Sequence, residues 1–194
     1  MHTARRLIVA FLALSPLAAA QAQIAPASIG LRYSEQVSNG PAGACGCFTL
    51  RGTALDASWN VGYSTPVLRL SAAFDAALEN TTNENGVGYG LTLSTFTAGP
   101  RISMHAHKLH PFAQALFGLA HGSGTQFPQS SGLMAHSANS FAFDLGVGSD
   151  YALTGRLSLR LPQLDYLHTA FPNNASNWQN NLRVAAGLTL RFPR

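Results

Sequence analysis

The sequence predicts an all-β fold, an eight-stranded antiparallel up-and-down β-barrel that crosses a membrane with its strands. Three observations predict this fold class. Apolar residues alternate with small or polar residues from position 27 onward, and the connections between the alternating segments are mostly short and long in turn. In addition, only 10% of the 194 residues are charged, whereas a water-soluble domain normally covers itself with charged side chains.

The start of the chain predicts a secretory signal peptide. Such a peptide begins with positive charge, continues with an apolar stretch and ends with small residues at the cleavage site. The chain shows this order, with two arginines, an apolar stretch of 14 residues, and then Ala20 and Ala22. The apolar stretch is shorter than the roughly 20 residues of a spanning helix. We therefore expect a signal peptide over residues 1–22, its removal, and one barrel domain over residues 23–194 in the outer membrane of a Gram-negative-type envelope.

The charge balance excludes two classes of protein. After removal of the signal peptide the chain keeps 10 basic and 8 acidic residues, so no nucleic-acid partner is expected. Low charge together with 46% hydrophobic residues is the opposite of the composition of a disordered chain.

The first four strands are predicted near residues 27–37, 47–58, 66–78 and 88–101. The third is typical: Leu70 and Phe74 fall on one face, whereas Arg69 and Asp75 fall on the other. In the second, the alternation slips near Ala54-Leu55, which predicts a β-bulge there.

The last four strands are predicted near residues 110–121, 139–151, 156–168 and 180–192. The eighth has the clearest pattern, with Leu182 and Leu188 on one face and Arg183 on the other. In the seventh, Pro162 interrupts the alternation and predicts a second β-bulge.

The connections indicate the orientation of the barrel. Short periplasmic turns are expected near residues 59–65, 102–109 and 152–155, and mostly longer outer loops near 38–46, 79–87, 122–138 and 169–179. Aromatic residues are expected as two girdles at the membrane surfaces. The periplasmic girdle contains Trp59, Tyr63, Tyr151 and Phe192, and the outer girdle contains Phe48, Tyr89, Phe141 and Tyr166.

Seven charged residues lie on the polar face of the predicted strands, which should line a narrow lumen. They are Arg32, Arg69, Asp75, Asp144, Arg160, Asp165 and Arg183. Because unpaired charges inside a barrel are costly, we expect a hydrogen-bonded ion network that plugs the lumen, with Arg160 or Arg183 as the partner of Asp144. A small solute channel is the alternative.

The chain resembles the OmpA/OmpX-like family of small eight-stranded outer-membrane β-barrels over roughly residues 27–192. The resemblance rests on the strand plan and on the segments 88–93, 112–118 and 188–192. It implies that Phe192 is the terminal aromatic residue that the outer-membrane assembly machinery recognises, although Pro193 and Arg194 follow it here. It also implies outer-membrane lipids as partners, and it indicates architecture rather than activity.

His121 and Ser123 are the candidates for catalysis. The spacing is similar to the His-x-Ser pair of outer-membrane lipid A deacylases, in which a Ser–His couple would attack an acyl ester. An acidic residue should orient the imidazole, but the next one in the chain, Asp144, is expected in the lumen. A polar loop entrance is the simpler interpretation.

Two further groups of residues could carry chemistry. His105, His107 and His110 could hold Zn²⁺ or Cu²⁺, but Lys108 lies among them and no carboxylate is adjacent, so we expect no metal. Cys45 and Cys47 could form a tight local disulfide or remain free thiols in an outer loop.

The sequence as a whole favours a monomeric outer-membrane barrel with no cofactor and no enzymatic activity. Its role would lie in the envelope itself or in what its outer loops contact. A lipid A-modifying enzyme that uses His121 and Ser123 is the alternative function, beside the channel. The sequence identifies no surface ligand.

Overall fold

The computed structural model describes residues 27–38, 48–84, 89–128, 133–171 and 178–192. Eight strands account for nearly all of them, as the alternation predicts. The strands are β1 (Ala27–Ser38), β2 (Phe48–Ser64), β3 (Leu68–Glu84), β4 (Tyr89–Met104), β5 (Leu109–Pro128), β6 (Met134–Ala152), β7 (Leu157–Thr169) and β8 (Gln179–Phe192). Within these ranges the structure contains no helix with the length and apolar character needed to cross a membrane.

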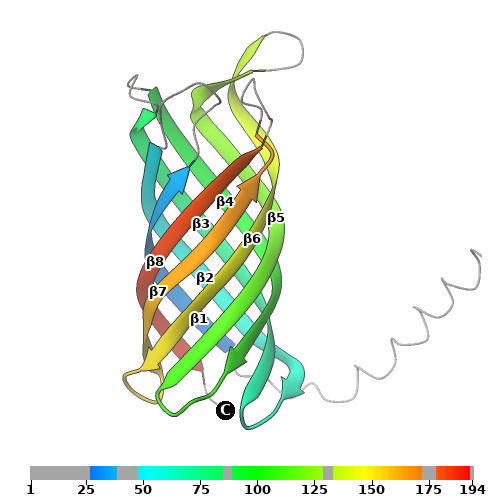
Figure 1. Cartoon of the computed structure of the whole chain (residues 1–194), viewed down its shortest axis with the longest axis vertical. Coiled ribbons are helices and arrows are strands. Elements are labelled where there is room, and N and C mark those ends of the chain that lie inside the picture. The colour runs from blue at the N-terminus through cyan, green and yellow to red at the C-terminus, as the bar shows by residue number, and fades with distance from the viewer. Residues whose placement is uncertain (1–26, 39–47, 85–88, 129–132, 172–177, 193–194) are drawn as a thin grey trace, which may run out of the picture.

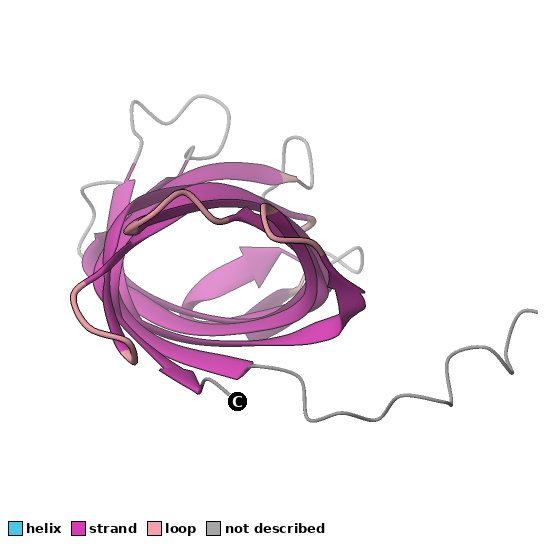
Figure 2. Cartoon of the chain, turned by 90° about the horizontal axis from the view of Figure 1, so that it is seen from below, coloured by secondary structure: helices cyan, strands magenta, loops and turns pink. Residues whose placement is uncertain are grey.

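The strands form one closed antiparallel barrel in sequence order (Figures 1 and 2). Strand β1 closes the ring by pairing with β8, where Leu31 lies opposite Leu188 and Ala27 lies opposite Phe192. Closure gives every strand two neighbours, so along the paired segments the backbone polar groups are satisfied within the sheet.

Several strands extend further than the sequence predicts. Strand β2 continues to Ser64, and the predicted loop near residues 122–138 is largely strand, because β5 ends at Pro128 and β6 begins at Met134. Polar and small residues in these extensions weaken the hydrophobic pattern, but ladder hydrogen bonds form regardless of side chain. The three short connections, 65–67, 105–108 and 153–156, lie at the end of the barrel where β8 finishes (Figure 1).

One of the two predicted bulges is present. The register between β7 and β8 shifts between Arg160 and Gln163, around Pro162. The bulge predicted near Ala54-Leu55 is wrong, because β2 keeps a continuous register with β1 and β3 through both residues. The apparent slip arises because the apolar side chain of Leu50 points inward, in phase with the buried Ala54.

The outside of the barrel is apolar. Leu31, Phe96, Phe117, Leu119, Leu145 and Leu188 are all at least 45% exposed and come from β1, β4, β5, β6 and β8. The aromatic side chains of Trp59, Tyr63, Tyr151 and Phe192 are exposed toward the end with the short turns, and those of Phe141 and Tyr166 toward the other end. The side chains of Phe48 and Tyr89 lie outside the described part. An apolar surface of this extent is typical of a protein that contacts lipid.

Candidate functional site

The lumen is closed by apolar side chains at the end opposite the short turns. Eight buried residues pack together there: Leu50, Leu91, Leu93, Ala120, Phe127, Ala142, Leu167 and Phe171. The rings of Phe127 and Phe171 lie 5.5 Å apart between centroids. The rule that small and polar side chains face inward therefore fails at this end, where leucine and phenylalanine fill the bore.

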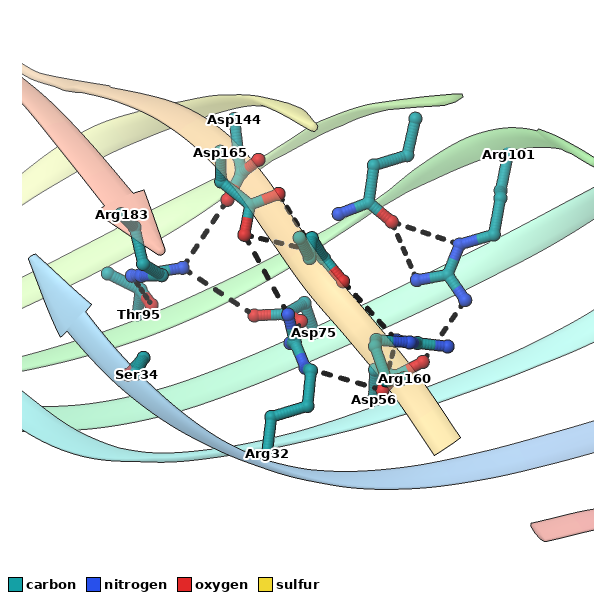
Figure 3. A network of polar contacts seen from close by, with 12 residues as sticks. Arg32, Ser34, Asp56, Asp75, Thr95, Arg101, Asp144, Arg160, Asp165 and Arg183 are labelled. Carbon is teal, nitrogen blue, oxygen red and sulfur yellow. Dashed lines mark hydrogen bonds and ion pairs between the residues drawn. The ribbon is translucent and has the colours of Figure 1, made fainter. Parts of the chain in front are cut away.

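A network of charged side chains fills the middle of the lumen (Figure 3). Asp56 lies at one centre of it, with oxygens 2.8 Å from Arg160 Nη1, 3.1 Å from Arg101 Nη1 and 3.4 Å from Arg32 Nε. Asp56 and Asp75 lie directly opposite each other on β2 and β3, and Arg32 pairs with both. The shared guanidinium offsets the repulsion that two facing carboxylates would otherwise experience.

Arg183 forms the second centre of the network. Its Nε lies 2.9 Å from Glu79 Oε1, and its Nη1 lies 3.4 Å from Asp144 Oδ2. Ser34 donates a hydrogen bond of 2.5 Å to the same Glu79 oxygen. Of the two arginines predicted as the partner of Asp144, the structure selects Arg183, whereas Arg160 binds Asp56 and Asp150.

Six of the seven predicted lumen charges lie buried in this network: Arg32, Asp75, Asp144, Arg160, Asp165 and Arg183. Arg69 is the exception, because it lies at the mouth of the lumen and pairs with no carboxylate among the described residues. Four members were missed by the sequence reasoning: Asp56, Glu79, Arg101 and Asp150. Glu79 is in phase with Asp75, one residue past the predicted strand end, and Asp150 is in phase with Asp144, so the period of two would have found both. Asp56 and Arg101 lie on strands in which no lumen charge had been identified.

Phe112 packs against the network on the side of the short turns. The guanidinium carbons of Arg101 and Arg160 lie 4.7 and 4.8 Å from the centroid of its ring, a cation–π arrangement. Gly148 on the neighbouring strand leaves room for this ring, since a β-carbon there would lie 2.7 Å from Phe112 Cζ.

A cavity of about 200 Å³ lies beyond Phe112, at the mouth of the lumen near the short turns. Its lining includes Arg69, Arg191, His105 and His110, which come from β3, β8, the turn after β4, and β5. The imidazole rings of His105 and His110 meet edge to face, with centroids 4.8 Å apart.

The three histidines predicted as metal candidates are not brought together. His107 lies on the turn with a φ of 51° and is exposed, whereas His105 and His110 face the cavity. Within the described residues, no group of three histidine, cysteine or acidic side chains could hold a metal ion. Cys45, Cys47 and the predicted signal peptide lie outside the described residues.

His121 and Ser123 lie on strand β5 rather than at a loop entrance. His121 Nδ1 lies 2.7 Å from Oδ1 of Asn139, its exposed neighbour on β6, so the amide oxygen accepts a hydrogen bond from Nδ1–H and leaves Nε2 free. No hydrogen bond joins His121 to Ser123 in the part of the chain that is described. Asp144 is buried in the lumen, as expected, and does not orient this imidazole.

No family model matches the chain, and no curated protein matches it either. Several solved structures, in contrast, are similar to it. Neisserial surface protein A superposes with a TM-score of 0.61 at 14% identity, covering 86% of this chain and 97% of its own. The attachment invasion locus protein Ail of Yersinia pestis, in complex with the heparin analogue sucrose octasulfate, superposes with a TM-score of 0.54 at 13% identity, covering 88% of this chain and 100% of its own.

Both of these proteins are small eight-stranded outer-membrane β-barrels. At such low sequence identity the likeness concerns the fold, and it extends over nearly the whole barrel. The chain therefore has the fold of the small eight-stranded outer-membrane β-barrels, the OmpA/OmpX-like architecture that its sequence predicts.

Proposed function

We propose that this protein is an integral outer-membrane barrel with a plugged lumen, whose role lies in the envelope or in contacts made at the cell surface. The observation that carries the proposal is the filled interior inside an apolar exterior. Leu188, for example, is 49% exposed on β8, whereas Arg183 on the same strand is 1% exposed. Lipid on the outside and ion pairs on the inside account for both values.

The layered lumen argues against the channel alternative. An ion would have to pass an apolar cluster, then the network centred on Asp56 and Arg183, and then the ring of Phe112. A barrel of eight strands leaves an interior that side chains can fill completely. The proposal is therefore a structural or surface-interaction protein without transport or catalysis.

Cell fractionation tests the location. We expect the protein in the outer-membrane fraction, with Gln23 as its first residue. In gel electrophoresis the unheated sample should migrate faster than the heated one, because the barrel stays folded. Recovery of folded protein from the soluble periplasm would contradict the proposal.

An acyl hydrolase acting at the outer end is the second candidate, because Asn139 holds His121 in the way that a triad asparagine holds a histidine. Ser123 would then be the nucleophile and Nε2 of His121 its base. The amide is a weaker electrostatic partner than the carboxylate that the sequence reasoning required. An assay of lipid A deacylation by the refolded protein tests this candidate. Release of acyl chains by the wild type, lost in Ser123→Ala and in His121→Ala, would support the hydrolase. No release by the wild type would reject it.

A further inference from the structure

The cavity at the mouth of the lumen is lined by two guanidinium groups that no carboxylate of the described residues pairs with. Arg69 and Arg191 both line it, so two like charges share this space. Within the described residues neither guanidinium forms an ion pair or a side-chain hydrogen bond, and the Nε atoms of both are buried without an acceptor. Every arginine of the central network, in contrast, binds at least one carboxylate.

The other charged groups of the lining are already matched. Arg101 binds Asp56 at 3.1 Å, and Asp150 is held by Arg160 at 2.7 Å. Arg69 and Arg191 are therefore the two charged groups of the lining that have no ion-pair partner among the described residues, in a space that is partly enclosed. Leaving such charges unpaired is unfavourable, and a bound anion would relieve it.

Several of the remaining lining residues can donate hydrogen bonds. His105 and His110 each have a buried Nδ1 without a partner, and hydroxyl groups of Ser71 and Ser103 line the same space. Burial and the nearby guanidinium groups of Arg69 and Arg191 lower the pKa of His105, so the imidazole is neutral at pH 7 and adds donors without further charge.

From this geometry we propose that the mouth cavity binds a phosphate group, either inorganic phosphate or the phosphate of a lipid headgroup. Phosphate matches the site better than a carboxylate does, because it carries up to two negative charges and offers more acceptor oxygens to donors on several sides. The volume of about 200 Å³ is several times the ~30 Å³ that one water molecule occupies in the liquid. In the proposed orientation the site faces the periplasm.

Calorimetric titration of refolded wild-type protein with inorganic phosphate, in a maltoside detergent, tests the proposal. We expect binding that Arg69→Gln and Arg191→Gln each weaken about tenfold, the effect of losing one charge-assisted contact. Arg156→Gln is the matched control, because Arg156 is an exposed arginine at the same end that does not line the cavity, and it should leave binding unchanged. No binding to wild-type protein, or equal loss in Arg156→Gln, would overturn the proposal.

A second arm distinguishes the two sources of phosphate. If titration of the protein in phosphatidylglycerol nanodiscs gives the same affinity, the ligand is soluble phosphate; if binding is seen only in detergent, lipid headgroups occupy the site. Histidine NMR gives an independent readout, since a bound anion should raise the pKa of His105 by offsetting the charges of Arg69 and Arg191. A His105 titration that phosphate does not move would overturn the proposal even if heat is measured.

Discussion

Arg160 and Asp56 are 104 residues apart in the chain, yet their side chains form an ion pair of 2.8 Å that connects β7 to β2 across the lumen. Strands β8 and β1 lie between them in the ring. The pair therefore links two strands that are not neighbours in the sheet. Asp56 also binds Arg101 of β4, which connects a third strand to them.

This arrangement makes Asp56 more important for stability than Asp144. Asp56→Asn removes the charge that faces three arginines, and we expect it to lower the free energy of unfolding by ~3–5 kcal/mol. Asp144→Asn should cost less, because among the described residues Asp144 forms an ion pair with Arg183 alone, at 3.4 Å, and Arg183 keeps Glu79. Urea titration followed by the fluorescence of Trp59 and Trp178 measures both. A larger loss in Asp144→Asn would show that the network is organised differently.

The lipid-facing surface is tested by introducing charge. Leu188→Arg should lower the free energy of unfolding in lipid vesicles by ~2–4 kcal/mol, because it places a guanidinium in the hydrocarbon. Leu153→Arg is the matched control: Leu153 is 51% exposed, against 49% for Leu188, but it lies in the turn between β6 and β7, where the charge reaches water. Equal effects of the two substitutions would mean that β8 does not face lipid at this position.

The apolar layer at the outer end is tested by truncation of one of its two phenylalanine side chains. Phe171 is 2% exposed and packs against Phe127, so Phe171→Ala should cost ~3–5 kcal/mol in unfolding free energy. Phe96→Ala, which removes an exposed ring from the outer face of β4, should cost clearly less. If urea titration gives the same loss for both variants, Phe171 does not close the lumen.

The role of Phe192 in assembly is tested in cells. Phe192 is 46% exposed at the end of β8, opposite Ala27, so its ring is accessible for recognition. We expect Phe192→Ala to lower the yield of folded barrel several-fold in cells while refolding from urea into detergent is unchanged. Tyr151→Ala, an exposed aromatic residue at the same end, should leave the cellular yield unaltered. An unchanged yield in Phe192→Ala would place the signal elsewhere.

Period-two alternation predicts the strands and the face of most residues, because a side chain in a closed barrel points either to the outside or into the lumen. It places Arg32 and Arg183 inside correctly, for example. It fails for Leu50, since hydrophobicity alone does not reveal that one end of the lumen is itself apolar.

The identity of ion-pair partners depends on a different kind of information. Arg183 of β8 binds Glu79 of β3, and which strands face each other across the bore follows from barrel closure and shear rather than from local sequence. The cavity is likewise invisible in the sequence, because Arg69 and Arg191 are 122 positions apart by number and converge only when the ring closes.

Recording the current through a planar bilayer that contains the refolded wild-type protein tests the central claim, the plugged lumen, most directly. The apolar layer, the ion network and Phe112 together predict no steady conductance above that of the bare membrane, at any ionic strength. Reproducible ohmic steps that scale with salt concentration would mean that ions pass through the barrel, and they would contradict this account.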